Sequence, residues 1–229
     1  MSDLLGCYIN LDGRPDRRAH MERELARFGL ADSYRRLKAT EATPGAIGCY
    51  RSHVRALELA RNHATPIHVL EDDSILSSAL APFLRSPRLL ELLAMFDIVF
   101  LDMWIDPYRP VVELYQSAIE HGDHVLPLDR PPARVACTSS YIVAPRSVRK
   151  VLRLLRQYQD ALKAIDVVWD EAIKAGRITA AVTIPFLTGV DLYIGSVSDI
   201  QRAMPRNENG RLIQLRTRFF VDKDRQPAI

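Results

Sequence analysis

The chain has 229 residues, of which 48% are hydrophobic and 26% are charged, and its formal net charge is +3. This composition is typical of an ordinary globular protein with one sizeable core. It excludes collagen-like chains, and no apolar run approaches the roughly 18 residues that a membrane span needs. Three scattered cysteines exclude a disulfide-rich secreted mini-protein and a zinc ribbon, so we expect a reduced, cytoplasmic setting.

Short apolar runs alternate with segments of helical periodicity along most of the chain. Strands are expected over residues 4–11, 34–38, 66–70, 97–101, 140–144 and 178–184. Helices are expected over residues 15–28, 44–57, 79–93, 145–157 and 166–175, with Pro15 in a first turn and Thr43 as an N-cap. This alternation predicts an α/β fold, with a Rossmann-type, mostly parallel sheet flanked by helices in a single domain.

The pattern breaks down between residues 104 and 134, where the chain is rich in proline and has few apolar runs. We expect a long loop there. Loops of this length inside a domain usually serve as functional lids or are disordered.

Acidic residues follow three of the expected strands. Asp12, the run of residues 71–73 and Asp102 each come directly after an apolar stretch. Ligands of parallel α/β sheets bind beyond the carboxyl ends of the strands, so these acidic groups should meet at one sheet edge.

The run Glu71-Asp72-Asp73 is the strongest local signal. Three consecutive carboxylates repel one another and need a compensating cation. Strand alternation would place Glu71 and Asp73 on the same side, where their oxygens could hold a hard divalent ion together with phosphates and water. The alternative is that Asp73 or Ser74 is the N-cap of a following helix.

The exit of the first strand is the second signal. Asn10 and Asp12 end the strand, and Arg14, Arg17 and Arg18 follow at the start of a helix. Backbone N–H groups and the positive end of a helix favour an anion there, and Asn10 and Asp12 could read a base or a ribose. The segment is neither a GxGxxG nor a Walker loop. The alternative is a polar turn whose arginines lie in solvent.

The third signal surrounds the start of the second helix. Gly45 and Gly48 each cost about 1 kcal/mol relative to alanine, which indicates close approach of another backbone or of a ligand. His53 is either a ligand contact or a packed, hydrogen-bonded histidine. Cys49 has no evident base partner, and we interpret it as a core residue.

Taken in order, these segments resemble glycosyltransferase family 25, the lipooligosaccharide-type galactosyltransferases. The resemblance is carried by blocks that extend along the chain to about residue 200: Tyr8-Ile9-Asn10-Leu11-Asp12 with Arg14 and Asp16-Arg17-Arg18, Pro44-Gly45, Ile47-Gly48-Cys49, Ser52-His53, Leu70-Glu71-Asp72-Asp73, Ser140-Tyr141-Ile142-Val143, Ile165-Asp166 and Ser198-Asp199-Ile200.

The resemblance implies a GT-A-like fold, a UDP-sugar donor (typically UDP-galactose) and inversion at the anomeric carbon. It also implies a divalent metal, manganese first and magnesium second, held by Glu71 and Asp73. Contacts to the nucleotide sugar are expected from Asn10, Asp12, Arg14, Arg17, Ser52, His53 and Asp72. Asp166 is our hypothesis for the catalytic base, and its alternative role is the N-cap of its helix.

The resemblance divides the chain into a catalytic domain, residues 1–200, and a basic tail, residues 201–229. Seven basic and three acidic residues between 202 and 225 give the tail a net charge of +4. It is either a contact for an anionic membrane surface or a solvated terminus. The expected partners are a UDP-sugar and a glycan or lipid-linked saccharide acceptor, with no nucleic acid. The expected location is cytoplasmic, with peripheral contact at the inner membrane face.

Three functions therefore compete. The first is a metal-dependent, inverting hexosyltransferase of cell-surface glycan synthesis. The second is a non-catalytic, glycosyltransferase-like nucleotide-binding module, against which the intact acidic triplet argues. The third is a nucleotidyltransferase, which would need a glycine-rich basic loop that the N-terminal segment lacks. Fold alone does not separate the three, because one scaffold hosts many functions.

Overall fold

The computed structural model describes residues 4–106, 109–122, 124–128, 134–159, 161, 163–191, 194 and 216–225. Its centre is a seven-stranded sheet with the order β2-β1-β3-β9-β5-β10-β7. These strands are β1 Leu5–Asn10, β2 Tyr34–Lys38, β3 Ile67–Glu71, β5 Ile98–Phe100, β7 His124–Pro127, β9 Ser140–Val143 and β10 Ala180–Ile184.

Within this sheet β1, β2, β3, β5 and β10 share one direction, while β9 and β7 run against them. Two small antiparallel pairs complete the described strands: β4 Ser74–Leu76 with β11 Thr188–Val190, and β6 Trp104–Asp106 with β8 Arg134–Ala136. The expected fold class is confirmed as a mostly parallel, mixed sheet flanked by helices in a single domain.

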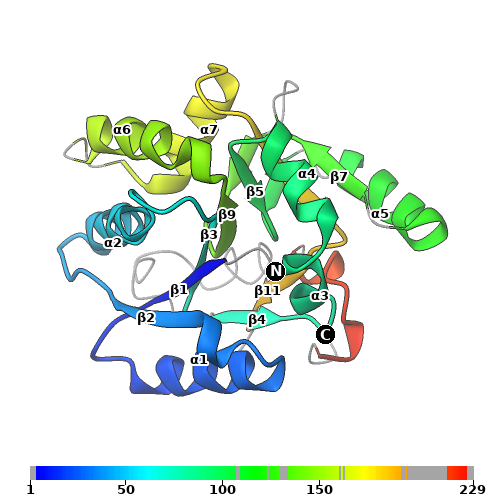
Figure 1. Cartoon of the computed structure of the whole chain (residues 1–229), viewed down its shortest axis with the longest axis horizontal. Helices are drawn as coiled ribbons and strands as arrows, with labels where there is room; N and C mark the ends of the chain where they lie inside the picture. Colours follow the sequence, from blue (N-terminus) through cyan, green and yellow to red (C-terminus); the bar gives the residue numbers. More distant parts are fainter. Residues whose placement is uncertain are drawn as a thin grey trace.

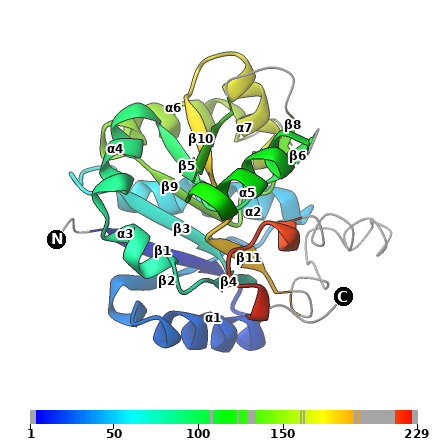
Figure 2. The same ribbon diagram turned by 90° about the vertical axis from the view of Figure 1, so that its right-hand side faces the viewer.

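Helices cover both faces of the sheet. The described helices are α1 Pro15–Arg27, α2 Gly45–Leu59, α3 Leu80–Leu84, α4 Pro87–Met95, α5 Arg109–His121, α6 Val148–Tyr158 and α7 Ile165–Lys174, with short 3-10 turns at Ala31–Ser33, Pro145–Ser147 and Lys223–Arg225. The apolar side chains of α2, α6 and α7 pack in one core cluster, and those of α1, α3 and α4 pack in another. Figures 1 and 2 show α1 and α2 on opposite sides of β1.

The two core clusters follow from period-2 alternation along the strands. Ile9 and Val69 pack toward the α2 face, whereas Tyr8 and Leu70 pack toward the α1 face. All four side chains are buried, because a central strand covered on both faces has no solvent side. The apolar runs in the sequence therefore correspond to these central strands.

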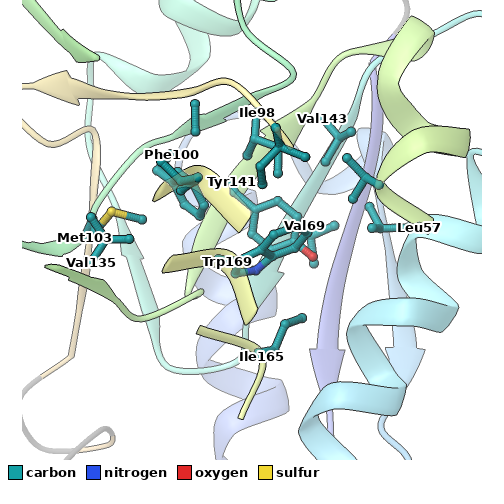
Figure 3. Close-up of a cluster of buried hydrophobic side chains, with 14 of the residues drawn as sticks. Leu57, Val69, Ile98, Phe100, Met103, Val135, Tyr141, Val143, Ile165 and Trp169 are labelled. Atoms are coloured by element: carbon teal, nitrogen blue, oxygen red, sulfur yellow. The ribbon is translucent and has the colours of Figure 1, made fainter. Parts of the chain in front are cut away.

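Aromatic side chains fill the middle of the core on the α2 face. Trp169 of α7 is 1% exposed, and its ring lies 6.1 Å from that of Tyr141 in an edge-to-face arrangement (Figure 3). Tyr141 also contacts Phe100, with ring centroids 6.0 Å apart. This packing fixes β9 and α7 behind the edge at which β3 ends.

The helix expected over residues 79–93 is two helices, α3 and α4. Pro87 has no N–H to continue the ladder, and Ser86 before it takes an extended backbone (φ −81°, ψ 151°). Ser86 then caps α4, since its hydroxyl accepts a hydrogen bond from the Leu89 N–H. The expectation of one helix was wrong because it ignored this proline.

The loop expected between residues 104 and 134 was also wrong. The described part of this segment forms β6, α5, β7 and β8, and β7 adds an edge strand to the main sheet. The sequence did contain a helical signal for α5, because Val111, Tyr115 and Ala118 form an apolar i, i+4, i+7 stripe. In the structure these three side chains pack toward the core. The prolines around it masked the pattern.

The second helix begins at Gly45, and Pro44 rather than Thr43 is its N-cap residue, with no side-chain cap. The close approach expected at the glycines is confirmed at Gly48. A Cβ there would overlap the carbonyl oxygen of Thr40, so this helix packs directly against the backbone that follows β2.

Residues 216–225 pack against the domain. Phe219 and Phe220 are buried, Phe220 bridges to Phe186, and Asp222 accepts hydrogen bonds from Ser78. The rest of the predicted tail lies outside the described residues, and the division at residue 200 stays a prediction. Across the described chain, no helix has the length and apolar character to cross a bilayer.

Candidate active site

A cleft of about 680 Å³ opens at the carboxyl ends of β1 and β3. Parallel pairing sets Ile9 beside Glu71, so the exits of both strands reach the same edge. The cleft is lined by the β1 exit, the loop after β2, the start of α2 and the acidic run: Ile9, Leu11, Gly13, Arg14, Arg17, Ala39, Thr40, Glu41, Ala42, Thr43, Gly45, Cys49, Ser52, His53, Glu71, Asp72 and Asp73. Of the expected site residues, seven are therefore brought together here.

Asp72 is buried and held from two sides. Its Oδ1 accepts a hydrogen bond from Arg17 Nη1 at 2.8 Å, and its Oδ2 accepts one from Asn10 Nδ2 at 2.8 Å. Asn10 in turn accepts a hydrogen bond from Arg36 Nε at 2.9 Å. The cation that the acidic run requires is thus Arg17, supplied by the first turn of α1.

Hydrogen bonding to the Asp73 carboxylate is incomplete among the described residues. Its Oδ2 lies 3.2 Å from Arg17 Nη1, while its buried Oδ1 has no hydrogen-bond partner among the described residues. Burial raises the pKa of Asp73 to about 7; Arg17 opposes this rise, and the neighbouring carboxylates Glu71 and Asp72 add to it. A desolvated carboxylate oxygen without a partner is a suitable ligand for a hard divalent cation, so the residues present fit such an ion.

Glu71 faces the start of α2. Its Oε1 accepts a hydrogen bond from Thr138 Oγ1 at 2.8 Å and lies 3.3 Å from His53 Nε2. Burial acts to raise the pKa of Glu71, but the hydrogen bonds from His53 and Thr138 outweigh it, and the pKa lies below its ordinary value. Glu71 therefore carries its negative charge into the cleft.

The alternative that Asp73 or Ser74 caps a helix was wrong. Asp72 and Asp73 form a turn, and Ser74 begins β4 rather than a helix. Ser74 is buried, and its hydroxyl donates to the Ser139 carbonyl oxygen. The turn lets all three acidic side chains reach the cleft, which strand alternation alone would not allow.

Ser52 and His53 are the eighth and ninth residues of α2. The Ser52 hydroxyl donates to the Gly48 carbonyl and accepts from the Thr40 N–H, so it fastens the helix to the loop after β2. The His53 ring is fully buried, and its Nδ1 lies 2.9 Å from the Tyr141 hydroxyl. His53 is thus both packed and turned toward the cleft.

Two expected site residues sit at the margin. Asp12 is exposed and pairs with Arg36 and Lys38 of β2. Arg14 lines the cleft and pairs with exposed Asp16. The block of residues 198–200, which carries the last part of the resemblance, lies outside the described residues.

Asp166 lies in the first turn of α7, where Ala164 is the N-cap residue, so the capping alternative was wrong. Asp166 is not among the residues that line the cleft. Burial raises the pKa of the Cys49 thiol, and Glu71, Asp166 and Asp73 raise it further. Asp166 and the acidic run therefore act on the same cleft side chain.

Sequence reasoning missed the residues behind the cleft. Thr138 and Ser139 precede β9, and Ser139 donates to buried Asp102 at 2.7 Å. Arg216, which the sequence places in a basic tail, is buried and pairs with Asp102. The run of Thr138, Ser139 and Ser140 before an apolar strand was the available signal, whereas Arg216 carried none.

A second concave region lies away from this cleft, between the end of α2 and α6. It encloses about 550 Å³ and is lined by Arg61, Asn62, Arg149, Leu152, Arg153, Arg156 and Gln157. Arg156 pairs with Glu58, whereas Arg61, Arg149 and Arg153 have no acidic partner within the described part of the chain. We call these seven residues the basic groove.

Comparison with known families decides the classification. Residues 30–169 match the sequence model of glycosyltransferase family 25, described as an LPS biosynthesis protein. The chain belongs to glycosyltransferase family 25. The match covers β2, α2, the acidic run, β9 and the start of α7, and with them most of the cleft. No curated protein matches the chain.

Solved structures were compared as well. A galactosyltransferase, LgtC, in complex with donor and acceptor sugar analogs is 11% identical, with a TM-score of 0.42 over 77% of this chain and 72% of that one. A mannose-1-phosphate geranyltransferase from Thermus thermophilus is 12% identical (TM-score 0.36, 79% and 74% covered). A putative glucose-1-phosphate thymidylyltransferase from Bacillus anthracis, in complex with a sucrose, is 10% identical, with a TM-score of 0.39 over 79% of this chain and 89% of that one.

Proposed function

We propose that this family 25 glycosyltransferase moves a hexose from a UDP-sugar to a saccharide acceptor of a lipooligosaccharide-type glycan, with inversion. Galactose is the first candidate for the hexose. The observation that carries the proposal is the Asp73 carboxylate, buried at the wall of a 680 Å³ cleft with one oxygen unpartnered among the described residues. A volume of this size accommodates a nucleotide sugar.

The donor would lie with its diphosphate against Asp73 and the β1 exit. Asp73, assisted by Glu71, would hold a divalent ion, manganese first and magnesium second. Such an ion stabilises negative charge that develops on departing UDP. Arg14 lines the same cleft and would share that charge from the donor's other side.

The nucleoside would lie toward β2 and the start of α2. Asn10 and Asp12 flank the β1 exit there, and Ser52 and His53 line the cleft wall. Asp72 supports this region indirectly, because it ties Asn10 to Arg17. These residues would set the orientation of the donor before the acceptor binds.

Asp166 would be the base that deprotonates the acceptor hydroxyl. Inversion requires one carboxylate opposite the leaving group. The influence of Asp166 on the Cys49 thiol supports a place beside the cleft. The only described hydrogen bond to its side chain is from the N–H of Val167, which leaves the carboxylate able to accept a proton.

The acceptor would be a glycan or a lipid-linked saccharide, and the basic groove supports peripheral contact with an anionic membrane face. Three cations without acidic partners within the described chain would attract phosphate-bearing headgroups. The described tail residue Arg216 does not contribute, since it is buried against Asp102. The basic groove would therefore attract an anionic membrane face independently of the predicted basic tail.

Isothermal calorimetry tests the donor. UDP, UDP-galactose and UDP-glucose would each be titrated with manganese and with chelator. We expect metal-dependent binding of UDP, tighter binding of one sugar nucleotide, and slow hydrolysis of that donor. Asp73→Asn should abolish the metal dependence, whereas Asp32→Asn, an exposed change at the opposite end of β2, should not.

Absence of UDP binding under both conditions would reject the UDP-sugar donor and favour the non-catalytic module. Binding without hydrolysis or transfer to any saccharide would favour the same module. Formation of a sugar nucleotide from a sugar phosphate would favour the nucleotidyltransferase.

A further inference from the structure

Three side chains of different chemistry converge on the wall of the cleft beside α2. Cys49 and His53 are four residues apart and lie on the same face of α2, and Glu71 reaches them from the end of β3. The Cys49 Sγ, one His53 ring nitrogen and one Glu71 carboxylate oxygen all lie within 4.8 Å of one another. We call these three residues the thiol cluster.

The spacing suits a tetrahedral ion. Two ligand atoms that each lie about 2.0–2.1 Å from such an ion are about 3.3 Å apart. The His53 Nε2 and Glu71 Oε1 atoms are separated by 3.3 Å. The Cys49 sulfur lies within 4.8 Å of both atoms and would supply the third ligand.

The surroundings orient the ligands. The His53 Nδ1 lies 2.9 Å from the buried Tyr141 hydroxyl, which leaves Nε2 for the cluster, and the Thr138 hydroxyl donates to Glu71 at 2.8 Å. Partners of this kind fix the ring and the carboxylate of metal sites. Cys49, His53 and Glu71 also line the cleft, so a fourth position would face its interior.

The donor set selects the ion. One sulfur, one imidazole nitrogen and one carboxylate oxygen favour zinc or cobalt, whereas manganese and magnesium prefer oxygen ligands throughout. Asp73 offers only oxygen and is paired with Arg17 rather than with the thiol cluster. The two groups therefore differ in chemistry even though they share a cleft.

We propose that Cys49, His53 and Glu71 form a binding site for a borderline-soft divalent ion such as zinc, with its fourth position open to the cleft. This site shares Glu71 with the hard-ion position at Asp73 but adds the sulfur and imidazole ligands that the hard-ion position lacks. The proposal does not depend on the identity of the donor or acceptor, and metal binding at this site is measured without either of them.

Cobalt supplies the spectroscopic probe. Cobalt(II) would be titrated into the full-length protein under reducing conditions. We expect tetrahedral d–d bands and a thiolate-to-cobalt charge-transfer band in the near ultraviolet, both removed by one equivalent of zinc. Manganese and magnesium should not remove them at equal concentration.

Variants locate the site. Cys49→Ser should abolish the charge-transfer band, while Cys137→Ser, a matched change at the other partly exposed cysteine, should retain it. Tyr141→Phe should weaken zinc binding about 10–100-fold, as expected for an orienting partner. Asp73→Asn should retain the band, because Asp73 is not a member of the thiol cluster. Circular dichroism checks that each variant is folded.

The proposal is overturned if folded wild-type protein shows no thiolate band, in which case His53 and Glu71 form only a hydrogen bond. It is overturned equally if Cys49→Ser keeps the band, or if Asp73→Asn loses it. A failed UDP titration leaves these results unchanged, so the two proposals fail separately.

Discussion

Arg17 and Asp72 are 55 residues apart in sequence, and the Arg17 Nη1 lies 2.8 Å from the Asp72 Oδ1 in the buried wall of the cleft. Their side chains are 9% and 10% exposed. The pair joins the first turn of α1 to the turn after β3, and Arg17 also reaches Asp73. One cation therefore holds two of the three carboxylates that line the cleft.

Arg17→Ala should lower the free energy of unfolding by about 3–5 kcal/mol, because it leaves Asp72 buried without its cation. The neighbouring Arg18→Ala is the control. Arg18 makes an exposed i, i+4 pair with Glu22, and its loss should change stability by about 0.5 kcal/mol or less. Urea denaturation measures both, and equal stability of the two variants would contradict the role given to Arg17.

Asp73→Asn should stabilise the metal-free protein by about 1–3 kcal/mol, since it removes a buried charged oxygen that has no partner among the described residues. Asp72→Asn should have the opposite effect, because Asp72 is satisfied by Asn10 and Arg17. Thermal unfolding in chelator measures the difference. Destabilisation of both variants would show that the Asp73 carboxylate is not an unsatisfied buried charge.

Asp166→Asn should lower kcat by about 10²–10⁴-fold, the usual contribution of general acid–base catalysis, and leave UDP affinity nearly unchanged. Steady-state kinetics with the identified donor, together with calorimetry, measures both quantities. Asp32→Asn provides the exposed control. Turnover that survives in Asp166→Asn would exclude this residue as the base.

Asp97 supplies the acid dependence of stability. It is 2% exposed and is contacted by Lys150 at 2.7 Å and by the Thr179 N–H at 2.9 Å. Burial opposes ionisation, but the hydrogen bonds from Lys150, Ser147 and Thr179 outweigh it and lower the pKa of Asp97 to about 2.

Because the pKa of Asp97 is lower in the folded state than in the unfolded state, ionised Asp97 stabilises the fold at pH values above the unfolded pKa of about 4. This stabilisation is lost as the pH falls toward about 2. Asp97→Asn should therefore destabilise the protein at about pH 7 and flatten the loss of stability between about pH 4 and pH 2. Asp32→Asn should leave the slope unchanged. A wild-type slope in the Asp97 variant would show that other carboxylates set the acid limit.

The basic groove should attract anionic membranes. Changing Arg149 and Arg153 together to Glu should weaken binding to vesicles containing phosphatidylglycerol by about 2 kcal/mol or more, a factor of about 30, at low salt. The control changes Arg18 and Arg88 to Glu on the opposite layer, with the same change in charge. Sedimentation with vesicles measures both, and equal losses would show that net charge alone matters.

The sequence by itself determined the layers of the fold and the position of the acidic run. Apolar alternation predicted the central strands, and Glu71, Asp72 and Asp73 had to emerge at the end of one of them. These features depend on local periodicity and on residues that are adjacent in the chain. Local reasoning failed where proline interrupted a helix, at Pro87, and where prolines surrounded one, at α5.

Only the tertiary structure decided which partner each carboxylate has. β9 pairs with β3 although about 70 residues separate their pairing positions, and this places Thr138 against Glu71. The chain end returns to bury Arg216 against Asp102. Such contacts depend on strand order and on side-chain burial, neither of which is encoded in neighbouring residues. The sequence could therefore locate the cleft, whereas the distribution of charge within it required the fold.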